Sequence, residues 1–389
     1  MKVLELAQIM AGPACGMLLA DLGADVIKVE RLPGGDDTRS YSRPSVKGES
    51  AAFMAMNRNK RGIALNLKVP AARDALKRMA AQADVVTENY RKGALEKLGL
   101  GYESLREINP ALIYCSVSGY GRTGPYADKG GFDLIAQGMS GLMSITGEPG
   151  GAPVKVGSPV CDINAGILAA LGVVSAYVHR LKSGRGQLVD TSLYEAGIHQ
   201  TFWHSAFYFA TGAAPGPSGS AHLLSAPYQA FAAADGWFNI GGANQANWER
   251  VARVLGAPEW IEDARFRSNA DRMQNLEALT GLMNVRLKAK TVSAWIAALE
   301  AEGVPCGPIN TIAAMATDPQ TVARDMVVAL QHPVAGPTRA LGVPIKLSAT
   351  PGVVHRPAPT LGQHTREVLA EFGFTGAEID ALYAGHAAA

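Results

Sequence analysis

The sequence predicts an α/β protein that contains a doubly wound parallel sheet and a second, smaller domain. Short apolar, β-branched segments alternate with helical segments from the N-terminus onward. The 389 residues exceed the usual size of one compact core, which favours two domains. Beyond residue 225 the composition changes, with short strand-like segments and polar helices around Trp248, Trp260 and Trp295.

The first predicted unit is strand, helix, strand. Residues 2–6 and 25–30 are strand-like, and the small residues of 11–24 predict a helix that stops at Gly23. A parallel βαβ unit follows from this order. The pattern recurs with a helix at 71–83, strands at 84–89 and 111–120, and a strand and helix start within 184–196.

Binding sites in such a domain are expected where strands lead into helices. The dinucleotide pattern G-x-G-x-x-G does not follow the first strand, where A-G-P stands instead, so nicotinamide and flavin binding are disfavoured. The Gly/Pro/Ser-rich segment 211–222 is predicted to be a linker or a loop over a site.

The composition argues against several function classes. The formal charge of +2, from 36 basic and 34 acidic residues, gives no reason to expect nucleic acid or a membrane as a partner. The four cysteines and eight histidines form no metal-binding pattern. The N-terminus begins in a predicted strand with no signal segment, and the cysteines are typical of reduced thiols, so we expect a cytoplasmic protein.

Basic residues recur at predicted strand ends of the first domain. Three separate loops at one sheet edge could converge on a phosphorylated ligand, because Arg and Lys form charge-assisted bonds to phosphate. The alternative is an ordinary solvated surface. The residues are Lys28, Arg31, Arg39, Arg58, Lys60, Arg61, Lys68, Arg91 and Lys92.

Asp162 is the most informative single residue. It ends a predicted strand, 155–162, and precedes a long apolar segment that predicts a buried helix. One interpretation is a helix N-cap. The other is a nucleophile, because a helix start keeps a poorly hydrated carboxylate ionised. Its neighbour Cys161 has no orienting histidine and is interpreted as a packing residue.

Several segments jointly resemble the class III, formyl-CoA transferase-like coenzyme A transferases (the CaiB/BaiF family). The resemblance covers essentially the whole chain. The segments are V-L-E-L-A-Q-I-M-A-G-P-A-C-G, G-D-D-T-R, N-R-N-K-R-G, T-E-N-Y-R-K-G, S-V-S-G-Y-G, P-V-K-V-G-S-P-V-C-D, G-R-G-Q-L-V-D-T-S-L, A-P-Y-Q-A-F, V-P-C-G-P-I-N and R-P-A-P-T-L-G-Q-H-T.

The resemblance implies a large Rossmann-like domain formed by residues 1–205 and 323–389, a small α+β domain at 225–322, and an interlocked homodimer. It implies transfer of CoA from a short acyl-CoA, such as succinyl-CoA, to a carboxylic acid through an aspartyl-CoA thioester on Asp162. CoA and acyl-CoA would be substrates, with no metal and no permanently bound cofactor.

By matched position, the resemblance also implies the residues that contact CoA. They are Ile9, Met10, Arg31, Leu65, Lys68, Asn89, Tyr90, Arg91 and Lys97. The segment 217–222 would be a loop that guards the intermediate, and Gln137, Tyr228 and His222 are candidate contacts for the acceptor acid.

Two departures from the family pattern narrow the activity. Phe132 stands where the racemase branch carries a histidine, which disfavours racemisation of a 2-methylacyl-CoA. Met10 stands where some relatives have glutamine, which makes a pocket for small polar acids such as oxalate doubtful. A non-catalytic CoA-binding protein, with Asp162 only a cap, is the alternative from another class.

Overall fold

The computed structural model describes residues 1–389, which form two compact units. The large unit comprises Met1–Leu142, Lys155–Gly212 and Pro319–Ala389. The small unit comprises Met143–Val154 and Ala213–Asp318.

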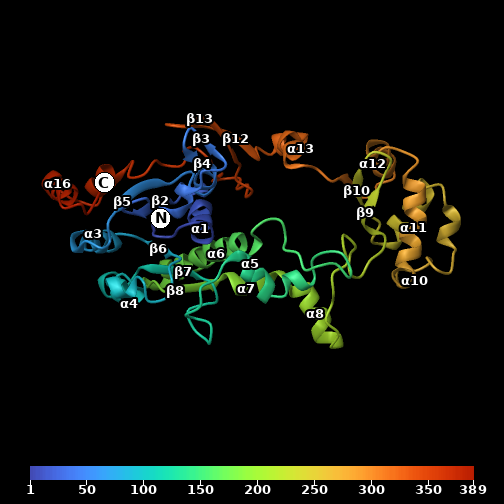
Figure 1. The fold of residues 1–389 in the computed structure, drawn as a ribbon, viewed down its shortest axis with the longest axis horizontal. Helices are drawn as coiled ribbons and strands as arrows, with labels where there is room; N and C mark the ends of the chain where they lie inside the picture. Colours follow the sequence, from blue (N-terminus) through green and yellow to red (C-terminus); the bar gives the residue numbers. More distant parts are fainter. The chain divides into compact units, whose positions relative to one another are not determined.

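A six-stranded parallel sheet forms the centre of the large unit, in the order β5-β2-β1-β6-β7-β8 (Figure 1). The chain builds β1, β2 and β5 outward in one direction, then returns to place β6 on the other side of β1. The strand order therefore reverses between β1 and β6, where ligands bind in doubly wound folds. The strands are β1 (Lys2–Glu5), β2 (Asp25–Arg31), β5 (Arg61–Leu65), β6 (Val85–Glu88), β7 (Ile113–Ser118) and β8 (Leu188–Ser192).

Helices and short hairpins complete the large unit. The helices are α1 (Ala11–Asp21), α2 (Ala51–Met56), α3 (Pro70–Ala80), α4 (Tyr102–Ile108), α5 (Asp133–Met139), α6 (Val160–Ser183), α7 (Leu193–Gln200), α8 (Phe202–Thr211), α14 (Pro319–Ala323), α15 (Thr365–Glu371) and α16 (Gly376–Ala384). The 3-10 turns are η1 (Asp37–Ser40) and η2 (Glu96–Leu98), and η3 (Leu142–Ser144) lies where the chain passes from the large unit to the small unit. The hairpins are β3 (Ser45–Val46) with β4 (Glu49–Ser50), and β12 (Val327–His332) with β13 (Gly336–Leu341).

Strands β1, β2, β5, β6 and β7 are almost fully buried, whereas the edge strand β8 is largely exposed. One core cluster joins β1, β2, β5 and β6 to α3, α4, α15 and α16. Helices α1 and α6 pack against each other through small residues. A Cβ built on Gly166 of α6 would lie 2.7 Å from Ala14 Cβ and 2.8 Å from the Ala11 carbonyl oxygen of α1. Glycine therefore permits the close approach of these two helices.

The small unit contains an antiparallel sheet in the order β11-β10-β9 and several helices. Its core contains Trp248, Trp260 and Trp295, which the sequence placed in this region. The elements are β9 (Tyr228–Ala232), β10 (Trp237–Gly241), β11 (Cys306–Pro308), α9 (Gln245–Val254), η4 (Pro258–Ile261), α10 (Asn269–Gln274), α11 (Leu276–Leu287), α12 (Val292–Ala301) and α13 (Ile312–Thr317).

The predicted parallel sheet and its first βαβ unit are confirmed. Residues 143–154, expected in the large domain, group with the small unit, where the Gly219 N–H donates to the Gly147 carbonyl at 2.8 Å. Residues 206–212 group with the large unit as the end of α8.

The strand predicted at 155–162 is wrong. Residues 155–159 are irregular, and α6 begins at Val160 with Pro159 as its N-cap residue. Proline lacks the N–H that a strand ladder requires and is well suited to the start of a helix.

Helix α6 is less buried than the sequence predicts. It buries one face, while Ile167, Leu171 and Leu181 are 47%, 61% and 71% exposed on the other. It is the one helix long and apolar enough to cross a membrane. This is weak evidence, because core helices of soluble proteins have the same length and composition.

Candidate active site

The carboxyl ends of four neighbouring strands bring most of the predicted CoA-binding residues to one edge of the large sheet. Because β5, β2, β1 and β6 are adjacent and parallel, the residues that follow them lie in the same order along this edge. From β5 to β6 they are Lys68, Arg31, Ile9, Met10, Asn89, Tyr90 and Arg91, with Lys97 on the following 3-10 turn.

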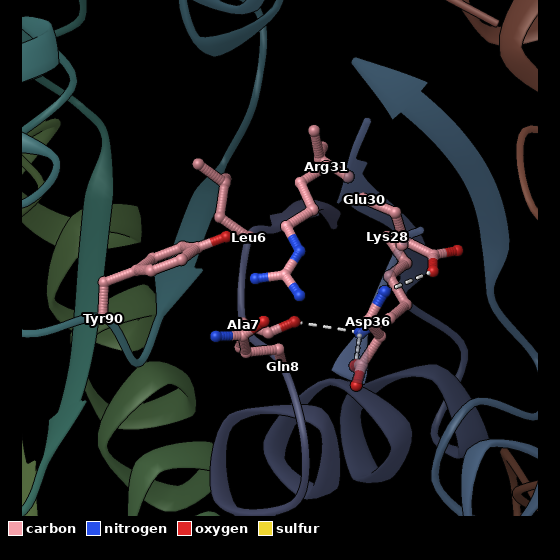
Figure 2. Close-up of a pocket in the computed structure, with 10 residues that line it drawn as sticks. Leu6, Ala7, Gln8, Lys28, Glu30, Arg31, Asp36 and Tyr90 are labelled. Carbon is pink, nitrogen blue, oxygen red and sulfur yellow. Dashed lines mark hydrogen bonds and ion pairs between the residues drawn. The ribbon is translucent and has the colours of Figure 1, made fainter. Parts of the chain in front are cut away.

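A pocket lies at the carboxyl ends of β1 and β2 and is closed on one side by Tyr90, which follows β6. Figure 2 shows the Arg31 side chain between Tyr90 on one side and Lys28 and Asp36 on the other. Its lining combines backbone from the end of β1 with these charged and aromatic side chains.

The predicted CoA contacts differ in how exposed they are. Lys68 and Lys97 are exposed and form no ion pair within the chain, so their ammonium groups are available to phosphates. Arg31 pairs with Asp37. Leu65 is fully buried in the core, so any contact that it makes with a ligand involves its backbone.

Arg91 links this edge to the segment that precedes α5. A Cβ built on Gly130 would lie 3.3 Å from Arg91 Nη2, so the guanidinium lies against this glycine. The next glycine, Gly131, packs still more closely, since a Cβ built on it would lie 2.7 Å from Gly119 Cα. Arg91 therefore lies close in space to the residues that lead into Asp133.

Several of the basic residues predicted to reach a phosphorylated ligand have structural roles instead. Lys28 and Lys60 are fully buried and share the Glu5 carboxylate, with Nζ–O distances of 3.2 and 2.8 Å. Burial lowers the pKa of Lys60 to about 8 despite this ion pair. Burial would also lower the pKa of Lys28, but the carboxylates of Glu5 and Asp36 raise it.

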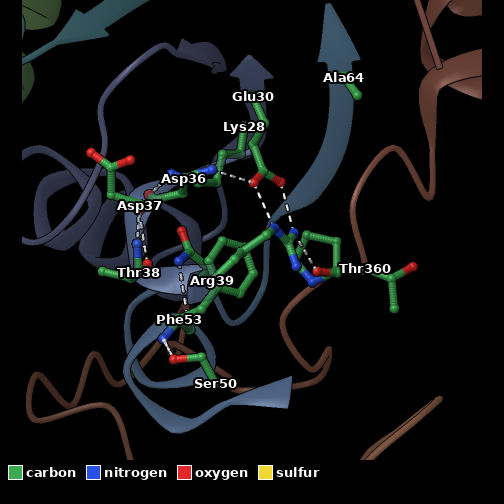
Figure 3. Close-up of polar contacts among 12 residues, drawn as sticks. Lys28, Glu30, Asp36, Asp37, Thr38, Arg39, Ser50, Phe53, Ala64 and Thr360 are labelled. Atoms are coloured by element: carbon green, nitrogen blue, oxygen red, sulfur yellow. Dashed lines mark hydrogen bonds and ion pairs between the residues drawn. The ribbon is translucent and has the colours of Figure 1, made fainter. Parts of the chain in front are cut away.

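Three arginines of the same set are also held in ion pairs. Arg58 pairs with Asp21 at 2.6 Å. Arg61 begins β5, at the opposite edge of the sheet, and pairs with Asp25 and Glu371. Arg39 forms two bonds to the Glu30 carboxylate and stacks on Phe53 (Figure 3). The sequence could not reveal these pairs, because each joins residues that are distant along the chain or in different elements.

Asp162 is the third residue of α6 and is not its N-cap. The cap is supplied from another helix: Asp133 Oδ1 accepts the backbone N–H of Cys161 at 2.9 Å. The half-buried Asp162 carboxylate has no hydrogen-bond or ion-pair partner within the chain. The interpretation of Asp162 as the N-cap is therefore wrong, and the capping role belongs to Asp133.

The electrostatics of Asp162 fit a nucleophile that is ionised at neutral pH. Burial, followed by the neighbouring Asp133 carboxylate, raises the pKa of Asp162 to about 6. A carboxylate of raised pKa is more basic and more nucleophilic than an ordinary one. Burial also raises the pKa of the Cys161 thiol, to about 12, so this cysteine is not a thiolate.

The topology places Asp162 at the same sheet edge as the predicted CoA contacts. Helices α1 and α6 both return the chain from the carboxyl edge to the amino edge, so they run parallel with their N-termini at the carboxyl edge. Asp162 lies on the same face of α6 as Gly166, one turn earlier. Since Gly166 contacts Ala11 and Ala14, a rise of about 6 Å brings Asp162 level with the turn that precedes α1.

That turn leaves hydrogen-bond donors unused. The N–H groups of Met10, Ala11 and Gly12, at the start of α1, have no partner within the chain, and no side chain caps the helix. Two helix N-termini therefore meet near Asp162, and their dipoles favour negative charge there.

Gln137, a candidate contact for the acceptor acid, holds the segment before α6. Its Nε2 donates to Asp133 at 2.7 Å, and its Oε1 accepts the Val156 N–H at 2.9 Å. Both ends of the Gln137 amide are thus engaged within the chain. Asp133, which sequence reasoning missed, completes this network; its only local signal is its place at the start of a short helix.

The other two candidates lie in the small unit. His222 stacks on Tyr228 with ring centroids 5.1 Å apart and planes 9° from parallel. The predicted loop 217–222 contains a turn closed by Ser218 and Ala221, and Ser220 Oγ accepts the Ala230 N–H of β9. This segment is therefore joined to the sheet of the small unit.

The parallel sheet, the pocket at the ends of β1 and β2 and the unpaired Asp162 carboxylate define a doubly wound α/β protein with a candidate active site at one edge of its sheet. The model of CoA-transferase family III matches residues 1–365. The chain is 41% identical to succinate–glutarate CoA-transferase of Agrobacterium fabrum, over 95% of this chain and 94% of that protein. It is 38% identical to mouse succinyl-CoA:glutarate CoA-transferase, over 95% of this chain and 85% of that protein.

A solved structure extends the similarity to the fold. A CaiB/BaiF family protein from Brucella suis matches with a TM-score of 0.86 and 41% identity, covering 96% of this chain and 98% of that one. The chain belongs to CoA-transferase family III, and its enzymatic class is that of a CoA-transferase.

Proposed function

We propose that the protein transfers CoA from a short acyl-CoA, in the first place succinyl-CoA, to a dicarboxylic acid through a covalent aspartyl-CoA thioester on Asp162. The observation that carries this proposal is the state of Asp162: an ionisable, half-buried carboxylate with no partner, next to two helix N-termini. The substrate class comes from the two glutarate CoA-transferases similar to this chain.

The first half-reaction exchanges one thioester for another. An Asp162 oxygen attacks the acyl-CoA carbonyl carbon, the C–S bond breaks, and the CoA thiolate leaves a mixed anhydride. The thiolate then attacks the aspartyl carbonyl and expels the donor acid as its carboxylate. The acceptor carboxylate attacks the resulting aspartyl-CoA, and the released thiolate attacks the acceptor carbonyl of the new anhydride. Asp162 is regenerated and no proton is transferred in the sequence.

This mechanism demands anion stabilisation rather than a general acid. Each tetrahedral intermediate carries an oxyanion, and preorganised N–H groups stabilise such charge strongly. The free N–H groups at the start of α1 are candidates for this role. The thiolate is a good leaving group, so the absence of a histidine beside Asp162 is no obstacle.

Racemisation at an α-carbon is disfavoured by the residue at position 132. Phe132, which directly precedes α5, is 70% exposed and has no ionisable group. A two-base proton exchange needs a second free acid or base beside Asp162, and the neighbouring Asp133 is engaged by the Cys161 N–H and the Gln137 amide. Incorporation of deuterium from solvent at the α-carbon of a 2-methylacyl-CoA would contradict the transferase assignment.

We also propose that the chain functions as a homodimer. The exposed face of α6 carries a continuous apolar row, which a soluble protein ordinarily covers. The row comprises Ile163, Ile167, Leu171, Val174, Val178 and Leu181. A second copy of the chain is the occupant that the family resemblance implies, and sedimentation equilibrium tests it.

The decisive experiment compares two neighbouring residues. Asp162→Ala should abolish exchange between succinyl-CoA and glutarate while leaving CoA binding largely intact. Cys161→Ala, a matched control one residue away, should keep activity. In the unsubstituted enzyme, mass spectrometry after succinyl-CoA treatment should locate a CoA adduct on the peptide that contains Asp162. Exchange that survives in Asp162→Ala would refute the nucleophile.

A further inference from the structure

The turn Gln8–Met10 connects β1 to α1 in an unusual conformation. Ile9 has φ +68°, a left-handed backbone that a β-branched residue rarely adopts. Such a conformation persists only where the surrounding structure holds it. The turn lines the pocket through Gln8 and leads directly into the free N–H groups at the start of α1.

Asp36 holds this turn from one side. Its two carboxylate oxygens lie 3.1 and 3.2 Å from the Ile9 nitrogen, which donates its N–H to them. Lys28 Nζ pairs with the same carboxylate at 2.8 Å and donates to the Ala7 carbonyl at 2.9 Å. Burial would raise the pKa of Asp36, but Lys28 and the hydrogen bonds lower it to about 2, so the acceptor stays charged.

Asn89 holds the turn from the other side. Its Oδ1 accepts the Gln8 N–H at 2.8 Å and its Nδ2 donates to the Gln8 carbonyl at 2.7 Å. The side chain thus imitates a strand partner for Gln8. This bond pair bridges the ends of β1 and β6, the two strands between which the sheet order reverses.

Gly12, in the first turn of α1, packs closely on Ala7 and touches Asn89. A Cβ built on Gly12 would lie 2.2 Å from Ala7 Cβ and 3.4 Å from Asn89 Cγ. With both ends of its amide engaged, Asn89 has one remaining acceptor lone pair and one N–H for a ligand. Its main bonds are to the protein backbone, which differs from the direct CoA contact implied by the family resemblance.

We propose that Asn89 and Asp36 are positioning residues that clamp the turn Gln8–Met10 in the conformation that receives CoA. The clamp fixes Ile9 in its left-handed conformation and orients the start of α1 beneath Asp162. This inference rests on the proposed function for its ligand. The clamp itself is formed by residues of the chain and is present without a bound ligand.

Hydrogen exchange of the ligand-free protein tests the clamp without relying on activity. Asn89→Ala should increase deuterium uptake in the peptide spanning residues 4–12 and weaken CoA binding about tenfold by calorimetry. It should raise KM for the acyl-CoA without changing KM for the acid. A loss of folded protein alone would lower kcat and leave both KM values unchanged.

Asn109 provides a matched control. Its Nδ2 donates to the Ala80 and Ala83 carbonyls, and its Oδ1 accepts the Ala111 N–H, but it precedes β7 at the opposite edge of the sheet. Asn109→Ala loses a comparable set of bonds and should change neither the exchange of residues 4–12 nor CoA binding.

A second variant addresses the other half of the clamp. Asp36→Asn keeps an acceptor for Ile9 but loses the charge, so it should increase exchange of the same peptide less than Asp36→Ala does. Weaker CoA binding by Asn89→Ala with unchanged exchange would overturn the proposal and make Asn89 a direct ligand contact. If Asn89→Ala changes neither the hydrogen exchange of residues 4–12 nor CoA binding, Asn89 has no role in the site. If neither the unsubstituted protein nor any variant binds CoA, the proposed function is wrong. The hydrogen-exchange result then still shows whether Asn89 and Asp36 hold the turn Gln8–Met10.

Discussion

Asp133 and Asp162 place two carboxyl groups at the first turn of α6, one as the cap of that helix and the other without a partner in the chain. Asp133 binds the backbone N–H of Cys161 and thereby contributes to the raised pKa of Asp162. The residue that fixes the start of the helix therefore also adjusts the basicity of the proposed nucleophile.

The first prediction concerns the pH dependence of activity. Asp162 must be ionised to attack, and burial together with Asp133 raises its pKa to about 6. We expect kcat/KM for the acyl-CoA to fall below pH 6 with a slope of one and to level off above pH 7. Asp133→Asn should move this acidic limb to lower pH, because it removes a like charge. If the acidic limb of the pH profile stays at the same pH in Asp133→Asn, Asp133 does not contribute to the raised pKa of Asp162.

The second prediction concerns stability. A carboxyl whose pKa is raised in the folded state binds its proton more tightly when folded, so stability decreases as pH rises from about 4 to 6. Asp162→Asn removes the ionisable group and with it this loss of stability at higher pH. At pH 7 the free energy of unfolding should increase by about 1 kcal/mol, a value reduced for partial solvent exposure.

Urea unfolding at pH 7.5 and pH 4.5, at one protein concentration, measures this difference. The gain should be present at pH 7.5 and nearly absent at pH 4.5. Asp263→Asn is the control, because the pKa of this exposed carboxylate is lowered rather than raised by its bond to Arg265. The loss of this carboxylate should not increase the free energy of unfolding. Equal gains at both pH values would contradict the raised pKa of Asp162.

The third prediction tests the contact between α1 and α6. Gly166→Ala should destabilise the protein by about 2 kcal/mol, because the new methyl would lie 2.7 Å from Ala14 Cβ. Gly281→Ala is the matched control: Gly281 lies inside α11 with no heavy atom within 4 Å of a built Cβ. It should stabilise the protein by about 0.5 to 1 kcal/mol. Thermal unfolding of both variants checks the pair.

Local patterns predicted the sheet well and the site only in part. The strands 2–5 and 25–31 and the helix between them follow from β-branched runs and a glycine stop, which are properties of adjacent residues. Asp162 can be selected as a candidate from the sequence because a carboxylate is conspicuous before a long apolar segment. Asp133, which caps the helix that contains Asp162, could not be found in this way. It lies 29 residues before Asp162 and binds the backbone N–H of Cys161.

Long-range pairing explains the remaining errors. Lys28 and Lys60 stand among the basic residues that recur at predicted strand ends, a pattern that indicates either a phosphorylated ligand or a solvated surface. Their common partner, Glu5, is 23 and 55 residues away, a distance over which no sequence pattern extends. The same holds for Asn89, whose backbone partner Gln8 is 81 residues away.

The fourth prediction tests the buried ion cluster. Lys60→Met should destabilise the protein by about 3 kcal/mol, because it leaves the Glu5 carboxylate with Lys28 alone and removes the donor to the Asn57 side chain. Glu5→Gln in the same background should recover part of the loss by removing the uncompensated charge. A double-mutant cycle by urea unfolding measures the coupling, and additive effects would show that Glu5 and Lys60 do not interact.

The last prediction concerns the phosphate end of CoA. Lys68 is exposed at the end of β5 and has no ion pair within the chain, so its charge is free for a ligand. Lys68→Ala should weaken CoA binding about fivefold at low salt, and the difference should shrink as ionic strength rises, because exposed charges are screened. Lys288, exposed in the small unit, provides the control. Equal effects of Lys68→Ala and Lys288→Ala would reduce the role of Lys68 to general electrostatic attraction.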